Sequence, residues 1–544
     1  MPLERKHPLS LKLGGFGNGC GATHWAPGWY GLCLNGDCSD GAFRPGPREV
    51  ADATGIAAGF RVVAAYLHVN VWHLATTDGT DTKIYQLDTT WKVIATITSR
   101  VATYNGLVSY NSVLAVAFGS ANPYQFSTNV TVNGTAYTFT ASTKTAANAD
   151  SANCFCVQTN GRVLPRVAYM TDPNDFYFTE DLTNGDATGS TATFIGDNNS
   201  SNSYVTSLVE DDTGNLIIGT RRALWGIGTQ GEPQRLTRDF DDGVADAGGQ
   251  SDRRNFEAYA EVEGRFYYIV SGNELLEYDH GDVNEYMAPK WQGRGIPRMG
   301  LPLNAIAAVG GKITLAMGTK NTLLGVAHAP GGTSRISNSF STVSELYQGQ
   351  YVQDENGARR FTWHGIILQC TDPLRFMWYA PSTNYLYLCS GDSESANLQQ
   401  TRCLMFRDNA LYHLVSSAIV LNTGTAQCEV LGIDLELPFY VKRAKGIALN
   451  TTGLGSSSSL PSLEVEYKIT GDFIAGSFET EFVNFLTNEE AQAGADFPSR
   501  SDFLTMDVRF RGVGNATDNT YAVLSDGELE FEAVADQQIR RQGR

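Results

Sequence analysis

The sequence repeats a short unit of strand, turn and strand from about residue 60 to residue 421. The clearest copy covers residues 204–228, where two runs of alternating apolar residues flank the polar segment 210–215 and a third apolar run follows. Alternation with a period of two, broken by Asp, Gly and Asn, is typical of antiparallel strands joined by tight turns. The repeat therefore predicts a chain built almost entirely from short β-strands.

Related units recur at a spacing of roughly 40 to 50 residues, which is the spacing of four-stranded blades in β-propellers. We therefore predict an all-β fold whose main part is a β-propeller-like repeat domain of six or seven blades. An array of β-hairpins in stacked sandwiches shares most of these signals and is the alternative. The further copies lie at residues 60–96, 160–180, 256–278, 303–329, 362–388 and 403–421.

Composition divides the chain into three segments. Residues 1–59 are rich in Gly, Pro, Trp and Cys and predict an extended arm, which must lie on another part of the protein or on a neighbouring subunit. Residues 60–424 hold the repeats. Residues 425–544 stop repeating and predict a C-terminal β-sandwich that serves for docking, with a short helical turn at residues 487–495.

The balance of charge limits the kinds of partner. The 544 residues include 58 acidic and 40 basic side chains, which gives a formal net charge of −18 at pH 7. This argues against a broad basic face that neutralises phosphates, yet it allows a polyanion to pass without sticking. No window of about 18 apolar residues predicts a membrane span. The N-terminal segment lacks the apolar region of a secretory signal peptide, so we expect synthesis in a cytoplasm.

Four potential metal ligands fall within nineteen residues of the arm: Cys20, His24, Cys33 and Cys38. Thiolates and imidazoles are the ligands that zinc prefers, and a metal would stabilise an arm that has no core of its own. The spacings match no compact zinc motif, so unpaired thiols or a disulfide formed later are the alternative. Apart from this metal-site hypothesis, no cofactor is predicted.

Common catalytic motifs are missing from the sequence. There is no G-x-S-x-G elbow, no H-E-x-x-H pair, no G-x-x-x-x-G-K-[ST] loop and no S-x-D-x-G-x-T-W sialidase box. We therefore expect no catalytic residues and a protein that is not an enzyme. A glycosidase needs only two suitably placed carboxylates, which the 58 acidic residues can supply, so this alternative stays open.

Two acidic segments predict exposed loops, one at residues 210–215 and one at residues 239–246. The aspartates of the second segment have the oxygen ligands that calcium needs, although the full spacing of a calcium loop is missing and a solvated acidic turn is the alternative. The acidic residues concerned are Glu210, Asp211, Asp212, Asp239, Asp241, Asp242 and Asp246.

Three stretches resemble proteins of the tail nozzle and neck ring of tailed bacteriophages, which are structural β-propeller proteins. Residues 35–50 (NGDCSDGAFRPGPREV) resemble the opening of that family, and residues 162–179 resemble one of its blades, with an Asp-Pro-Asn turn between two strands. Residues 508–534 resemble its closing sandwich strands. The cysteine-rich arm departs from the family's pattern, which leaves the role of residues 1–40 open. The residues of the opening that match are Asn35, Gly41, Arg44, Pro45 and Gly46.

The resemblance implies a structural virion protein of a phage tail or neck, made in the host cytoplasm. It would form a ring, expected to be hexameric, around the DNA channel, and take part in genome retention and ejection. Its partners would be copies of itself, the portal, adaptor or other tail proteins, and double-stranded DNA in passage. The acidic loop residues named above would face the channel, and Arg44, Arg509 and Arg511 would dock neighbouring subunits.

The alternative hypothesis is a carbohydrate-binding or glycoside-cleaving β-propeller. Its tryptophans could stack on sugar rings, although tryptophans in blades also serve as core residues. A cellular scaffold propeller that binds peptides is a third option, which the lack of Trp-Asp blade dipeptides disfavours. The tryptophans considered for sugar stacking are Trp25, Trp29, Trp225, Trp291 and Trp363.

Overall fold

The structure is a computed structural model of the 544-residue chain. It describes residues 4–10, 15–16, 29–30, 32–34, 36–38, 42–45 and 49–51 of the arm, and most of the chain from residue 56 to residue 538. The stretches of eight or more residues outside the description there are 191–204, 241–254, 286–302, 318–343, 391–400, 412–424, 454–461, 484–491 and 514–522.

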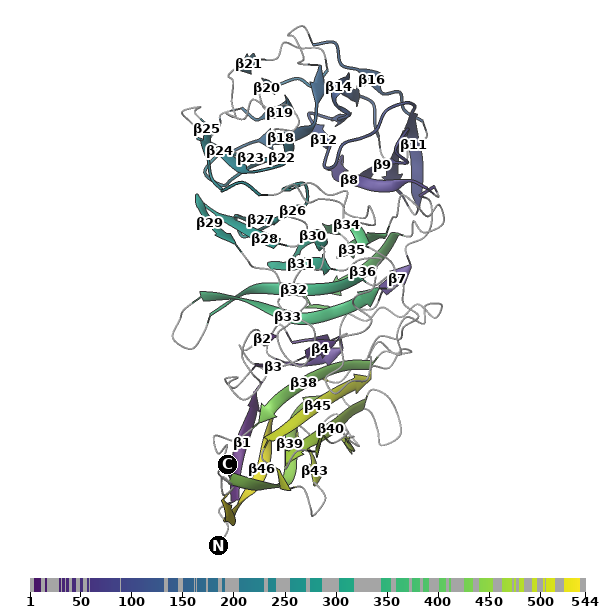
Figure 1. Ribbon diagram of the computed structural model, residues 1–544. Coiled ribbons are helices and arrows are strands. Elements are labelled where there is room, and N and C mark those ends of the chain that lie inside the picture. Colours follow the sequence, from purple (N-terminus) through teal and green to yellow (C-terminus); the bar gives the residue numbers. More distant parts are fainter. Residues whose placement is uncertain are drawn as a thin grey trace.

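The described chain is all-β, as predicted, and most of its strands lie in consecutive four-stranded antiparallel sheets or in runs of four antiparallel strands within larger sheets (Figure 1). Four of these sheets lie within residues 61–235: β8 (Arg61–His68), β9 (Val71–Thr77), β10 (Thr82–Leu87) and β11 (Trp91–Ile97); β12 (Leu107–Tyr110), β13 (Val113–Val116), β15 (Gln125–Ser127) and β16 (Thr140–Ala141); β18 (Cys154–Gln158), β19 (Arg166–Asp172), β20 (Asp175–Thr179) and β21 (Thr188–Ser190); β22 (Val205–Glu210), β23 (Leu216–Thr220), β24 (Leu224–Ile227) and β25 (Pro233–Arg235).

The pattern continues to residue 411. The following strands are β26 (Tyr259–Val262), β27 (Arg265–Val270), β28 (Glu274–Asp279) and β29 (Asp282–Glu285); β30 (Leu303–Val309), β31 (Lys312–Met317), β32 (Ser344–Gln353) and β33 (Arg359–Cys370); β34 (Leu374–Ala380), β35 (Tyr385–Ser390), β36 (Thr401–Arg407) and β37 (Ala410–Leu411). A two-stranded sheet of β14 (Gly119–Pro123) and β17 (Ser151–Ala152) is inserted among them.

The first strands of most neighbouring sheets lie side by side, and that of the last sheet returns to the first. Strand β8 contacts β12, β12 contacts β18, and β18 contacts β22; β26 contacts β30, β30 contacts β34, and β34 returns to β8. Across the centre, the Asn105 side-chain amide donates a 2.9 Å hydrogen bond to the carbonyl oxygen of Glu257, 152 residues away in the sequence. This is the arrangement of a β-propeller, so the predicted fold class is confirmed. The predicted number of six or seven blades stays a prediction.

Several hairpins close through two-residue turns in which both residues have positive φ. Such type I′ turns match the twist of antiparallel strands, and Gly and Asn adopt them with little strain. The turns of this kind are Val69–Asn70, Asn111–Ser112, Glu263–Gly264, His280–Gly281 and Gly310–Gly311. Polar turn residues of the repeat therefore serve a geometric purpose, because they set the pairing of the flanking strands.

The described strands of the arm join sheets built from distant parts of the chain. Strand β1 (Glu4–Ser10) pairs with β46 (Val523–Gln538), and β7 (Glu49–Ala51) pairs with β36. Strand β4 (Leu32–Leu34) lies between β33 and β38 (Thr425–Ile433). Short strands complete the arm: β2 (Gly15–Phe16), β3 (Trp29–Tyr30), β5 (Gly36–Asp37) and β6 (Arg44–Pro45).

The C-terminal part contributes strands to two sheets. One continues from β33 through β4 and β38, and the other contains β1, β46 and their neighbours (Figure 1). The predicted helical turn at residues 487–495 is wrong at its end, because β43 pairs with β39 and extends the second sheet. The segment boundaries at residues 59 and 424 stay a prediction. The remaining strands are β39 (Tyr440–Thr452), β40 (Ser462–Gly471), β41 (Ile474–Ala475), β42 (Glu479–Val483), β43 (Gln492–Asp496), β44 (Asp502–Phe503) and β45 (Thr505–Val513).

Apolar side chains fill the spaces between neighbouring sheets. Between the β22–β25 and β26–β29 sheets, Phe256 and Tyr268 are fully buried, and their rings lie 5.5 Å apart, edge to face. Burial of such a side chain contributes roughly 1.5–3 kcal/mol to stability. The packed sheets therefore hold the inter-strand turns in fixed positions at the rim of the propeller. No helix among the described residues is long and apolar enough to cross a membrane.

Candidate functional site

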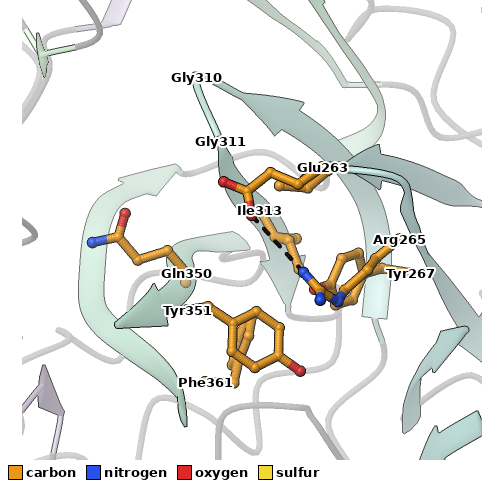
Figure 2. A pocket seen from close by; sticks show the side chains of 11 residues that line it. Glu263, Arg265, Tyr267, Gly310, Gly311, Ile313, Gln350, Tyr351 and Phe361 are labelled. Atoms are coloured by element: carbon orange, nitrogen blue, oxygen red, sulfur yellow. Dashed lines mark ion pairs between the residues drawn. The ribbon is translucent and has the colours of Figure 1, made fainter. Parts of the chain in front are cut away.

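A pocket of about 150 Å³ lies between the β26–β29 sheet and the strands β30–β33 (Figure 2). It combines aromatic, charged and glycine residues from two adjacent sheets, a mixture typical of small-molecule sites. The described residues that line it are Val262, Glu263, Arg265, Tyr267, Gly310, Gly311, Ile313, Gly349, Gln350, Tyr351 and Phe361.

Two type I′ turns form the mouth of the pocket. Glu263 begins the turn between β26 and β27, and Gly310 and Gly311 form the turn between β30 and β31. Both glycines are exposed and have positive φ, at 53° and 77°. A Cβ atom added at Gly311 would come within 4.0 Å of the Glu263 carboxylate. Because Gly310 and Gly311 have no side chains, only backbone atoms lie beside Glu263, and the mouth of the pocket is open.

The floor of the pocket is tightly packed. Tyr267 and Ile313 are each 1% exposed. A Cβ atom on Gly349 would lie 2.7 Å from a ring atom of Trp363 and 2.8 Å from the ring of Phe361. These distances are shorter than any normal carbon contact, so only glycine fits at this position of β32. The absence of a side chain allows the two rings of β33 to lie directly on the β32 backbone.

Aromatic rings form one wall. The Phe361 ring lies 5.3 Å from Tyr351, edge to face, and 6.0 Å from Tyr267. Its other neighbour is Trp363, at 5.1 Å. Edge-to-face pairs of this kind contribute roughly 0.5–1.5 kcal/mol beyond their buried area. The wall is therefore a rigid surface rather than a set of mobile side chains.

Arg265 is held in place by several partners. Its Nε donates to Asp279 Oδ2 at 2.8 Å, and its Nη1 lies 3.8 Å from Glu263 Oε2. The guanidinium carbon lies 5.0 Å from the centre of the Tyr351 ring, a distance typical of a cation–π contact. Figure 2 shows Arg265 beside the Tyr351 ring with its ion pair to Glu263. These contacts fix the position of the Arg265 guanidinium at the pocket.

A buried carboxylate supports the wall from behind. Glu277 is 1% exposed and accepts hydrogen bonds from the Tyr351 hydroxyl at 2.7 Å and 2.6 Å, one to each oxygen. Burial, reinforced by Glu277, raises the pKa of both Tyr351 and Tyr267 above the ordinary value. Both phenols therefore stay protonated at neutral pH, and the Tyr351 hydroxyl is used by Glu277 rather than by a ligand.

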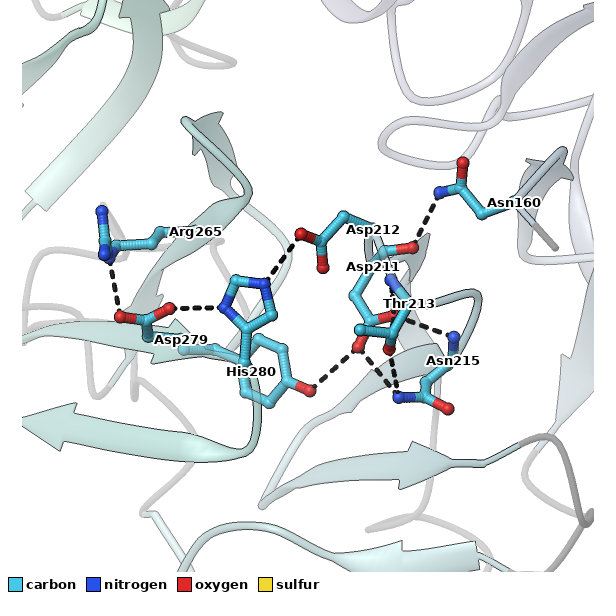
Figure 3. A network of polar contacts seen from close by, with 9 residues as sticks. Asn160, Asp211, Asp212, Thr213, Asn215, Arg265, Asp279 and His280 are labelled. Atoms are coloured by element: carbon cyan, nitrogen blue, oxygen red, sulfur yellow. Dashed lines mark hydrogen bonds and ion pairs between the residues drawn. The ribbon is translucent and has the colours of Figure 1, made fainter.

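A polar network links this site to the neighbouring sheet (Figure 3). The His280 ring donates at two positions, from Nδ1 to Asp279 Oδ1 at 2.6 Å and from Nε2 to Asp212 Oδ2 at 2.8 Å. The hydrogen bonds to Asp279 and then to Asp212 raise the His280 pKa to about 9, so the ring is positively charged at neutral pH. Burial alone raises the Asp279 pKa, but its bonds to His280 and Arg265 outweigh burial and hold the pKa below its ordinary value.

Next to this network, Asp211 organises its own turn. Its carboxylate accepts hydrogen bonds from the backbone N–H of Thr213 and Asn215, at 3.0 Å and 2.8 Å, and from the Tyr278 hydroxyl at 3.2 Å. Asp211 is 1% exposed. Such a buried and well-bonded aspartate is a turn-forming residue.

The other acidic residues of the predicted channel loops fall in different environments. Glu210 accepts hydrogen bonds from the backbone N–H of Thr159 at 2.7 Å, and Asp239 pairs with Arg235. Asp212 is exposed, whereas Asp211 is not. Whether these residues face a channel stays a prediction. Asp241, Asp242 and Asp246 lie outside the described residues.

The arginines predicted to dock neighbouring subunits lie in strands. Arg509 Nη1 pairs with Glu466 Oε2 at 2.9 Å, and Arg511 Nη1 lies 3.1 Å from Glu464 Oε2. These are cross-strand pairs between β45 and β40. Arg44 is half-buried in β6. The docking role of these three residues stays a prediction.

Most of the predicted zinc site lies outside the part of the chain that the structure describes. Cys20 and His24 lie outside the described residues, Cys33 belongs to β4 without a described side chain, and Cys38 is buried. Among the side chains that the structure describes, no three His, Cys, Asp or Glu groups are placed to hold a metal ion. The metal-site hypothesis therefore stays a prediction.

Of the tryptophans proposed for sugar stacking, neither of the two whose side chains the structure describes lines the pocket. Trp363 is 6% exposed and packs behind Phe361, and Trp225 is half-buried with the Arg235 guanidinium 5.8 Å from its ring. Trp29 belongs to β3, without a described side chain, and Trp25 and Trp291 lie outside the described residues.

The aromatic residues that do line the pocket were not singled out by the sequence. Tyr351 and Phe361 lie more than 80 residues from Arg265, and the sequence gives no sign that β27 and β32 meet. One signal was present, because the Glu-Gly pair at residues 263–264 marks a tight turn followed by an arginine and a run of aromatic residues.

No family model matches the chain, and no curated protein matches it in sequence. Solved structures that are similar to it include a streptogramin B lyase, at 10% identity over 66% of this chain and 98% of that one, with a TM-score of 0.38. The extracellular domain of a hybrid two-component system from B. thetaiotaomicron matches at 8% identity over 85% of this chain and 56% of that one, with a TM-score of 0.39. A luciferin-regenerating enzyme matches at 10% identity over 57% and 94%, with a TM-score of 0.32.

The expectation that the chain is not an enzyme is corrected by these comparisons. Two of the three similar structures are enzymes by name, a lyase and a luciferin-regenerating enzyme, so a fold of this kind gives no ground for excluding catalysis. At these low identities the similarity concerns the fold alone, and neither activity nor substrate passes from those proteins to this chain.

Proposed function

We propose that this chain is a carbohydrate-binding β-propeller and that the pocket between β26–β29 and β30–β33 is its sugar site. The observation that supports the proposal is the combination, around about 150 Å³, of an aromatic wall with a charged rim. Tyr351 and Phe361 offer ring surface to the C–H face of a sugar. Arg265, Glu263 and Gln350 offer donors and acceptors to its hydroxyl groups.

Sugars need both kinds of contact, since each pyranose ring has an apolar face and a hydroxyl-rich edge. A pre-formed wall lowers the entropy lost on binding, because few side chains must be ordered. The volume is small compared with pockets for drug-sized ligands, which enclose roughly 300–1,000 Å³. The pocket therefore suits one sugar ring, such as the end or a branch of a glycan.

A binding assay tests this proposal. The full chain is applied to a glycan array, and the best ligands are measured by calorimetry and also checked for cleavage. We expect Tyr351→Ala to weaken binding at least tenfold, with Tyr110→Ala as the matched control, since Tyr110 is a half-buried tyrosine of β12, in another sheet. A chain that binds no glycan, or that binds equally well without Tyr351, would contradict the proposal.

A structural role in a phage tail is the second candidate. It is supported by the sequence resemblance of residues 35–50, 162–179 and 508–534, and by the way the arm pairs with β46, β33, β38 and β36. Such pairing ties the propeller to the C-terminal strands in one elongated molecule (Figure 1), a shape that suits a ring of radial wedges.

Immunogold labelling of purified phage particles with antiserum against the chain tests this second candidate. Label at the tail or neck is the expected result. If the particles carry no label while the protein is found free in the lysate, the tail role is excluded.

A further inference from the structure

We infer that the pocket selects uncharged sugars over acidic sugars, an inference that rests on the proposed carbohydrate-binding function. The reason is the way its charges are already paired. Among the lining residues that the structure describes, Arg265 is the one cation and Glu263 is the one anion. A sugar carboxylate would be attracted by Arg265 but repelled by the Glu263 carboxylate beside it.

Arg265 has little capacity left for a ligand's negative charge. Asp279 takes its Nε at 2.8 Å, Glu263 lies 3.8 Å from Nη1, and the side chain is only 17% exposed. The guanidinium is further fixed over the Tyr351 ring. An incoming carboxylate would bring a third negative charge to a guanidinium whose charge two carboxylates already balance.

The surroundings add more negative charge than positive charge. Behind the wall, Glu277 is buried against Tyr351, and on the other side Asp279 and Asp212 flank His280. Those two aspartates balance the positive charge of His280, so His280 adds no net positive charge beside the pocket. Lys312 lies between the lining residues Gly311 and Ile313, so the alternation of β31 directs its side chain to the opposite face of the strand.

Hydroxyl groups meet no such conflict. A sugar hydroxyl donates to the Glu263 carboxylate, whose side chain is 57% exposed at the mouth, and accepts from a guanidinium N–H of Arg265. Because an uncharged hydroxyl both donates and accepts, it binds between the two charges without separating them. Glu263 repels a sugar carboxylate, whereas Glu263 and Arg265 together give a neutral sugar one hydrogen-bond acceptor and one donor.

Matched pairs of sugars test the inference. Methyl β-glucoside is compared with methyl β-glucuronide, and the corresponding galactoside with its galacturonide, by calorimetry with the full chain at pH 7. In whichever pair the chain binds, we expect the neutral sugar to bind at least tenfold more tightly than the acidic sugar. Raising the salt concentration is expected to narrow the difference, because screening weakens the repulsion.

Two variants test whether Glu263 causes the preference for neutral sugars. Glu263→Gln removes the anion of the mouth and is expected to reduce the preference to less than threefold, mainly by improving binding of the acidic sugar. Glu261→Gln is the control: Glu261 is exposed on the same strand, β26, and does not line the pocket, so the preference is expected to persist.

The outcomes separate the two proposals. If the chain binds neutral sugars but binds the uronide equally well or better, the charge selection is wrong while the sugar site remains. If Glu263→Gln leaves the preference unchanged, the assignment to Glu263 is wrong. If no sugar of either kind binds, both the inference and the proposed function are overturned.

Discussion

Gly349 shows how strongly one residue can be dictated by its neighbours. Its position on β32 looks like an ordinary strand residue in the sequence, and only the structure shows Trp363 and Phe361 against its backbone. The predicted repeat units at residues 303–329 and 362–388 leave out β32, and the sequence gave no sign of this contact, because the two rings come from the other strand of a hairpin. Requirements that arise from packing between strands cannot be read from local patterns.

A substitution at this residue gives a first prediction. Gly349→Ala is expected to destabilise the protein by about 1–3 kcal/mol, because a Cβ atom would overlap the Trp363 and Phe361 rings. Chemical denaturation measures the change. Gly228→Ala is the control, since a Cβ atom there would meet a single neighbour, at 3.7 Å, and its effect is expected to be much smaller. Equal effects at the two positions would contradict the account.

His73 gives a second prediction at the residue scale. Burial lowers its pKa to about 4, while the same side chain in the unfolded chain has a pKa near 6.5. The unfolded state therefore binds the proton first as pH falls, so stability is lost between about pH 6.5 and pH 4. At about 1.4 kcal/mol for each pKa unit, the full loss approaches roughly 3 kcal/mol.

The loss is measured as the free energy of unfolding at pH 7 and at pH 4.5, in the wild-type chain and in His73→Gln. His73 bonds the Val71 carbonyl at 3.0 Å and faces the Gln86 amide at 3.0 Å, so the variant keeps a polar group in the space. The variant is expected to show a smaller loss at low pH. An identical pH dependence in both proteins would show that His73 does not carry the effect.

At the scale of elements, turns were predicted better than the segments between them. The Asp-Gly and Gly-Gly pairs at residues 78–79 and 310–311, inside the predicted repeats 60–96 and 303–329, form turns between strands. Residues 130–139 also read as a hairpin, with a turn at the Asn-Gly pair 133–134. That turn lies outside the described residues, the described residues beside it form no strand, and Tyr137 donates its backbone N–H to the Ile94 carbonyl of β11. A hairpin signal is local, whereas docking onto β11 depends on a segment 40 residues earlier.

The His280 turn joins two sheets and gives a third prediction. Because hydrogen bonds to Asp279 and Asp212 raise its pKa to about 9, the charged ring stabilises the folded state fully below about pH 6.5. This stabilisation is lost as pH rises through about 9. We therefore expect thermal stability to fall between pH 7 and pH 10 by more in the wild-type chain than in His280→Gln.

Titration of the His280 ring by NMR measures the same quantity directly. A pKa well above 8 is the expected result, and it should drop in Asp212→Asn, which removes the negative charge of one of the two acceptors. A pKa near 6.5 in the wild-type chain would mean that the network of Figure 3 does not form in solution.

At the scale of the whole molecule, the all-β repeat fold followed from sequence periodicity, but the course of the arm did not. Strands β1 and β46 lie at opposite ends of the chain and pair in one sheet, with Lys6 bonded to Glu528 at 3.0 Å. Nothing in the glycine-rich and cysteine-rich pattern of residues 1–59 indicates these partners. The pocket was missed for a similar reason, since Arg265 of β27 meets Tyr351 of β32 and Phe361 of β33, more than 80 residues later in the sequence.

The arm gives a fourth prediction. Removal of residues 1–10 deletes β1 and uncovers one edge of β46, so the backbone amides of β46 that bond β1 are expected to lose protection in hydrogen exchange. The amides of the β8–β11 sheet serve as the internal control and are expected to keep their protection. Unchanged exchange in β46 would contradict the pairing.

The most direct test of the central claim is a crystal structure of the chain with the best neutral sugar found by the array. We expect one sugar ring against Tyr351 and Phe361, with hydroxyl groups bonded to Arg265 and Glu263. A sugar bound at another place on the propeller, with this pocket unchanged, would contradict it.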